Sequence, residues 1–168
     1  DALEGGTQHR SGTELAEALE RIGARLGVTT GWEGTSVSMS CLADRLEEAL
    51  GLLAEAVLEP AFPEDEVDRA REQQLAAIRQ RTMDPSALAS MEASRRYFVS
   101  GIPYARPQDG TEESIGTVTP ELLSGFVEAS YRPAGGGLIV AGDVDPDEIE
   151  TMANDRLGAW TGAPRAAE

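Results

Sequence analysis

An alternating run in the first third of the chain limits the fold more than any other feature. Across residues 35–42, apolar side chains alternate with serines: Val37, Met39 and Cys41 with Ser36, Ser38 and Ser40. A period of two places the apolar side chains on one face of a β-strand. Glu33-Gly34 separates this run from residues 28–32, which predicts a hairpin. A hairpin with one apolar face needs a second layer of structure to cover that face.

Helical patterns surround the hairpin. Ser11 and Glu14 have the spacing of a capping box, and Pro63 precedes acidic residues suited to the first turn of a helix. The apolar spacing and the Pro and Gly positions predict helices over residues 12–26, 46–57, 63–80, 86–99, 120–131 and 146–160. Residues 101–116 are rich in Gly and Pro and predict a loop.

A third strand is predicted late in the chain, over the short apolar run at residues 137–144. Two early strands, several helices and a lone late strand favour an α+β fold, with helices packed on a mostly antiparallel sheet. Three strands make a thin sheet, so we expect strands that precede Asp1 to complete it. Residues 1–168 are therefore interpreted as a single partial domain, truncated at its N-terminus.

The composition excludes some partners. The 168 residues carry 30 acidic and 14 basic side chains, a formal net charge of −16, and every basic residue is Arg. Such a charge repels phosphate backbones and anionic lipids, so we expect neither nucleic acid nor a membrane as a partner. No run approaches the roughly 18 apolar residues that a membrane span needs. The single Cys41 excludes an internal disulfide and slightly favours the cytoplasm; localisation is otherwise open.

The residues themselves show no active site. His9 is the only histidine, and a polar residue just before a helix cap is typical of an exposed side chain, although it could also act as a base or ligand. Cys41 lies on the apolar strand face and fits a buried thiol better than a nucleophile. One His and one distant Cys do not form a zinc cluster. We assign no metal and no cofactor to this chain.

A set of short motifs nevertheless resembles the pitrilysin/insulinase family of zinc metallopeptidases, which includes the mitochondrial processing peptidase and its non-catalytic subunits. The motifs follow the family's order along the chain: Gly6-Thr7, Arg10-Ser11, residues 19–24 (LERIGA), residues 53–62 (LAEAVLEPAF), Pro103-Tyr104, Gly110-Thr111 with Ile115, residues 131–133 (YRP) and residues 138–145 (LIVAGDVD). The resemblance implies a half-domain of the processing-peptidase type. It also implies that two such halves pair around a chamber for unfolded peptide segments.

The same resemblance implies that this chain lacks the family's zinc site. Active members carry an H-x-x-E-H motif on a helix, whose second His aligns with Asp1, and a later helix supplies a Glu ligand and a supporting Glu. Those two carboxylates align with Ala77 and Ala70, which lie seven residues, or two helical turns, apart. Glu72 cannot replace them, because it points about 140° away from Ala77. No catalytic residue is therefore carried over, and zinc is expected only in active homologues.

Three functions are consistent with these residues. The first is a non-catalytic peptidase-like half or subunit that completes a peptide-binding chamber with an active homologous half. The second is an active zinc endopeptidase whose ligands lie outside this chain or are misaligned here, so whether the protein is an enzyme stays open. The third is a purely structural or docking subunit. The implied partners are a homologous peptidase half or subunit and unfolded peptide.

We predict that the purified protein holds no stoichiometric zinc. Ala70 and Ala77 offer methyl groups where the resemblance requires carboxylates, and a methyl group cannot bind a metal ion. Elemental analysis after dialysis against a weak chelator measures the metal content. Near-equimolar zinc that survives dialysis would show that the alignment of these positions is wrong.

Overall fold

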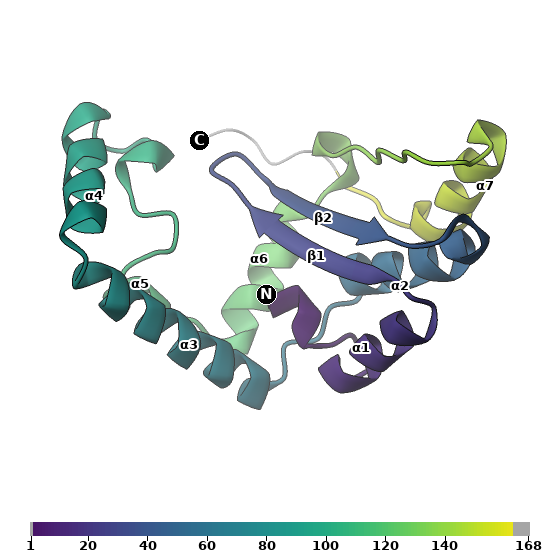
Figure 1. Ribbon diagram of the computed structural model, residues 1–168, viewed down its shortest axis with the longest axis horizontal. Coiled ribbons are helices and arrows are strands. Elements are labelled where there is room, and N and C mark those ends of the chain that lie inside the picture. The colour runs from purple at the N-terminus through teal and green to yellow at the C-terminus, as the bar shows by residue number, and fades with distance from the viewer. Residues whose placement is uncertain (1, 163–168) are drawn as a thin grey trace.

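The computed structural model describes residues 2–162, in which helices pack against one β-hairpin (Figure 1). This part of the chain holds six α-helices of ten or more residues, one short α-helix and four 3₁₀ turns. In order, the elements are η1 (Ala2–Gly5), α1 (Gly12–Arg21), β1 (Arg25–Thr30), β2 (Thr35–Ser40), η2 (Ala43–Arg45), α2 (Leu46–Leu58), α3 (Glu64–Thr82), α4 (Pro85–Tyr97), η3 (Pro103–Ala105), α5 (Glu112–Gly116), α6 (Pro120–Ser130), η4 (Pro133–Gly135) and α7 (Pro146–Leu157).

The predicted hairpin is confirmed, and its strands pair antiparallel. Leu26 lies opposite Met39, and Val28 lies opposite Val37. Strand β1 begins at Arg25, earlier than the predicted Val28, because α1 ends at Arg21 instead of continuing to residue 26. The helix stops there because Gly23 adopts a φ of 64°, a left-handed conformation that reverses the chain direction.

The core lies between the hairpin and two helices. Its buried members come from α1 and the residues after it and from α2: Leu15, Ala18, Ile22, Ala24, Ala49 and Leu52. Leu26, Met39 and Cys41 of the hairpin segment pack against this group, so the alternating run turns its apolar face toward the helices. The α+β fold class, with helices on one face of an antiparallel sheet, is therefore confirmed.

Helices α3 and α4 form an arm that extends away from the hairpin, on the left of Figure 1. Asp84 separates them and caps α4, accepting a hydrogen bond from the Ser86 backbone N–H at 2.8 Å. Aromatic contacts join the far end of the arm to the hairpin tip. The Trp32 and Tyr104 ring centroids lie 5.6 Å apart, and those of Phe98 and Tyr104 lie 5.5 Å apart.

Two predicted elements differ from the structure. The predicted loop at residues 101–116 contains the short helix α5, which Thr111 caps. The strand predicted over residues 137–144 is wrong: within residues 2–162 the sheet holds only β1 and β2. Ile139 is 93% exposed and Leu138 is 44% exposed, so this apolar run is extended without neighbouring strands to pair with it. Sheet membership requires hydrogen-bonding partners as well as suitable side chains.

Among the helices of residues 2–162, none combines the length and apolar composition needed to cross a bilayer.

We predict that Gly23→Ala lowers the free energy of unfolding by about 1 kcal/mol, the cost of placing an L-residue in the left-handed region. A Cβ at Gly23 would meet no atom within 4 Å, so the effect isolates the backbone conformation. Gly125→Ala is the matched control, because it also has open space but lies inside helix α6. There alanine should stabilise by about 0.5–1 kcal/mol. Urea unfolding measures both; a Gly23→Ala protein as stable as the parent would contradict this account.

Candidate functional site

One face of helix α3 carries both alanines that the sequence analysis singled out. Pro63 precedes the helix, and Glu64, Asp65 and Glu66 occupy its first turn, where carboxylates interact favourably with the helix dipole. Ala70 and Ala77 lie on the same side of this helix, and both line one cavity of about 700 Å³.

Three separate parts of the chain enclose this cavity. Its walls come from η1, from the start and one face of α3, and from residues 115–123, which run from α5 into α6. The lining residues are Ala2, Glu4, Gly5, Phe62, Pro63, Glu66, Val67, Arg69, Ala70, Arg71, Gln73, Gln74, Ala77, Ile115, Val118 and Leu123. Figure 1 shows η1 and α6 beside the first turns of α3. The cavity is mainly apolar, with charged groups and amides along α3.

The predicted site positions are partly brought together. Asp1 lies outside the described residues, but its neighbour Ala2 lines the same cavity as Ala70 and Ala77. Glu72, rejected as a substitute on helical geometry, does not belong to the lining. Within residues 2–162, no three His, Cys, Asp or Glu side chains gather closely enough to hold a metal ion.

Polar side chains of α3 hold the segment that closes the cavity on the far side. The Arg71 guanidinium donates to the Val118 carbonyl oxygen at 2.9 Å, and the Gln74 amide donates to the Asp109 carbonyl oxygen at 3.1 Å. Further along the helix, the Arg79 guanidinium pairs with Glu112 at 2.8 Å. These contacts fix Ile115 and Val118 against α3 and thereby give the cavity its second wall.

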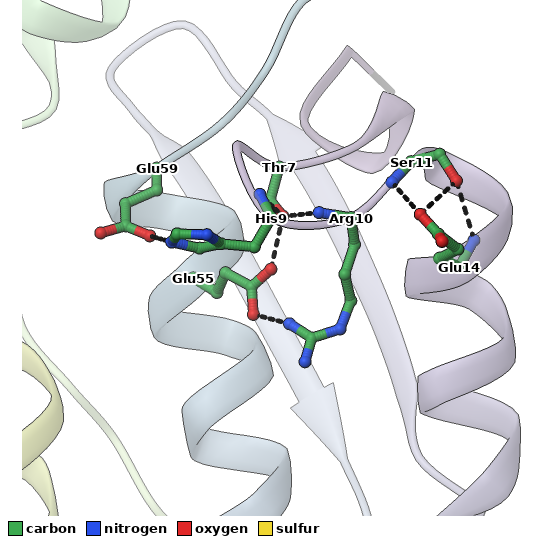
Figure 2. Close-up of polar contacts among 7 residues, drawn as sticks. All are labelled: Thr7, His9, Arg10, Ser11, Glu14, Glu55 and Glu59. Atoms are coloured by element: carbon green, nitrogen blue, oxygen red, sulfur yellow. Dashed lines mark hydrogen bonds and ion pairs between the residues drawn. The ribbon is translucent and has the colours of Figure 1, made fainter.

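The opposite wall is positioned by Glu55, which lies in the quoted motif at residues 53–62 but received no role from the sequence alone. Glu55 of α2 is only 13% exposed and accepts a hydrogen bond from the Thr7 hydroxyl and one from the Arg10 guanidinium (Figure 2). The Thr7 hydroxyl oxygen in turn accepts from the Arg10 backbone N–H at 3.0 Å. We call Thr7, Arg10 and Glu55 the Glu55 clamp.

The clamp ties the segment after η1 to the end of α2. The Gln8 N–H donates to the Glu59 carbonyl oxygen at 2.9 Å, and the Ala61 N–H donates to the Gly6 carbonyl oxygen at 3.0 Å. Gly6 has a φ of 133°, and a Cβ there would lie 2.9 Å from the Arg10 carbonyl oxygen, so only glycine fits. Gly6, Thr7 and Arg10 belong to the quoted motifs, and their role here is structural. Glu55 belongs to another quoted motif, residues 53–62, but nothing in the sequence indicates that it pairs with Arg10, 45 residues earlier.

His9 and Cys41 both take structural positions. The His9 imidazole pairs with Glu59 at 2.6 Å, and both side chains are largely open to solvent (Figure 2). Cys41 is half-buried against the core, and burial followed by the negative charge of Asp44 raises the pKa of its thiol. A raised pKa reduces the thiolate fraction at neutral pH and with it the nucleophilicity of this sulfur.

Comparison with known proteins identifies related chains. The family model described as Insulinase (Peptidase family M16) matches residues 2–98. An uncharacterized zinc protease of Mycobacterium leprae is 31% identical over 91% of this chain and 34% of its own length. A protein of Helicobacter pylori described as the non-peptidase homolog YmxG is 25% identical over 92% of this chain and 36% of its own length. The chain thus spans about a third of the length of these curated relatives.

A solved structure resembles the whole fold. The crystal structure described as a peptidase M16 inactive domain from Pseudomonas fluorescens superposes with a TM-score of 0.89 and 29% identity. The match covers 99% of this chain and 41% of the other. The similarity therefore extends over nearly the whole chain.

We predict that Glu55→Ala lowers the free energy of unfolding by about 2–3 kcal/mol. The change removes a charged acceptor with little exposure and leaves the buried Thr7 hydroxyl without it. Glu48→Ala on the same helix is the control, since its ion pair with Arg45 is exposed on both sides and should contribute little. Thermal and urea unfolding of both variants measure the difference. Equal stability of the two variants would show that the Glu55 clamp contributes no more to stability than an exposed ion pair.

Proposed function

Because the chain belongs to the insulinase family, peptidase family M16, we propose that it is a non-catalytic peptidase-like half. In this proposal it completes a peptide-binding chamber together with an active homologous half or subunit. The observation that carries the proposal is the α3 face, where Ala70 and Ala77 present methyl groups to the cavity beside η1. The likeness to a solved domain described as inactive supports the same conclusion.

The chemistry at this face supports binding more than cleavage. Hydrolysis by a zinc peptidase needs a metal held by ligands with lone pairs and a general base on the metal-bound water. The described part of the cavity offers Glu4 and Glu66 as carboxylates, and Glu66 is already paired with Arg69. No histidine lies among the lining residues within the described range.

An active peptidase is the second candidate, favoured by the relative from Mycobacterium leprae that is described as a zinc protease. In that case the metal ligands of the whole protein lie outside this chain or at positions other than Asp1, Ala70 and Ala77. Zinc is a cofactor of this protein only under that alternative. A purely structural subunit is the third candidate, and it would bind a homologue without binding peptide.

We predict that the full-length protein that carries this chain does not cleave unfolded peptides alone. It should bind a homologous chain that carries H-x-x-E-H, and the pair should cleave such peptides. Light scattering measures association, and a fluorogenic unfolded peptide measures cleavage. The control replaces the glutamate of the homologue's H-x-x-E-H by glutamine, which should abolish cleavage and keep association.

Each alternative gives a different result. Cleavage by the protein alone, with zinc bound, would establish the active peptidase instead. Association without any binding of peptide would establish the structural subunit.

A further inference from the structure

We propose that residues 103–112 form an electrostatic strap, which joins the end of α3 to the hairpin tip and opens as one unit while the core stays folded. The strap returns from the end of α4 to α5 along the arm (Figure 1). It operates whether or not the chain completes a peptide-binding chamber.

The strap has few of the contacts that normally hold a segment in place. None of its residues is buried. Its backbone hydrogen bonds are local, from the Arg106 N–H to the Pro103 carbonyl oxygen at 3.0 Å and from the Gly110 N–H to the Pro107 carbonyl oxygen at 3.1 Å. Within residues 2–162, none of its backbone groups bonds to the backbone of α3 or of the hairpin. Segments with so few buried contacts open at a lower free energy than the core.

Side chains attach the strap to α3, and two of these contacts are ion pairs. The Arg79 guanidinium donates to Glu112 at 2.8 Å, and the Arg81 guanidinium pairs with Asp109. The Gln74 amide also donates to the Asp109 carbonyl oxygen. Both arginines lie in the last turn of α3, so positive charges of the helix meet negative charges of the strap along this edge.

The pair between Arg81 and Asp109 is the more sheltered of the two. The Arg81 side chain is 24% exposed, and its Nε and Nη2 atoms are buried without an acceptor in residues 2–162. Asp109 therefore offsets the burial of this guanidinium, and salt screens the pair less than it screens an exposed one.

Other side chains of the strap attach it to the hairpin tip. The Tyr104 hydroxyl donates to Glu33 at 2.5 Å, and the ring centroids of Tyr104 and Trp32 lie 5.6 Å apart. The Gln108 amide donates to the Thr30 carbonyl oxygen. The strap thus links α3 to the hairpin, and its opening breaks that link.

Salt should act on the strap and on the whole molecule with opposite signs. It weakens the attraction of Arg79 for Glu112 and of Arg81 for Asp109, which favours opening of the strap. The net charge of −16 makes the folded chain repel itself, and salt screens this repulsion, which favours the folded state. Easier opening of the strap in a more stable protein therefore distinguishes an electrostatic attachment from general loosening.

Hydrogen exchange of the full-length protein, followed by mass spectrometry, tests this inference. Between about 0.05 M and about 0.5 M NaCl, the strap amides that include Arg106 and Gly110 should exchange about fivefold faster. Over the same range the amides of α2 should exchange no faster, and the melting temperature should rise.

Matched variants identify the ion pairs. Glu112→Gln removes the partner of Arg79 and should speed exchange in the strap by about threefold at low salt. Glu113→Gln is the control, because it makes the same change of charge at the next residue, which is exposed and forms no ion pair within residues 2–162, and it should leave the exchange unchanged. Equal melting temperatures of the two variants establish that both are folded.

A further variant tests whether the strap opens as one unit. Tyr104→Phe removes the hydrogen bond to Glu33 at the hairpin and should also speed exchange at Gly110, near the attachment to α3. An effect confined to the neighbours of Tyr104 would show that the two ends open separately. Exchange in the strap that slows with salt as in the core, or equal exchange in Glu112→Gln and Glu113→Gln, would overturn the electrostatic attachment.

Discussion

The arrangement around the cavity depends on the hydrogen bonds that the Glu55 carboxylate accepts from Thr7 and Arg10. This carboxylate anchors Thr7 and Arg10 to α2, and α2 is the helix that covers the hairpin. Because the anchored segment follows η1 directly, the clamp also places η1 against α3 and so determines one wall of the cavity. The Glu55 carboxylate thus joins the core to the candidate site. Because it is partly buried and charged, its removal should lower the free energy of unfolding more than the removal of an exposed ion pair.

The sequence predicted those elements whose signals are local. Ser11 with Glu14, Asp84 before Pro85, and Thr119 before Pro120 each cap a helix within one turn, and the corresponding helices begin where these residues indicate. The hairpin was predictable for the same reason, since alternation and a turn lie within a dozen residues. The run at residues 137–144 has the composition of a strand, but composition does not supply the backbone partners that a strand requires.

The candidate site was only partly predictable. The resemblance placed Ala70 and Ala77 on one helix face, and the structure puts both in one cavity. The cavity itself depends on Arg71, Gln74 and Arg79, whose contacts reach 33 to 47 residues along the chain. Contacts between residues so far apart leave no periodic pattern in the sequence.

The aromatic contact between the arm and the hairpin has a mechanical consequence. Side chains of α3 bond along its length to residues 109–118, and Tyr104 braces the far end of the arm against Trp32, with a hydrogen bond from the Tyr104 hydroxyl to Glu33 at 2.5 Å. Movement of the arm relative to the hairpin would therefore require the Tyr104 contacts with Trp32 and Glu33 to break. The indole of Trp32 sits at the brace itself. A motion of the arm that separated Tyr104 from Trp32 would therefore change the surroundings of this indole.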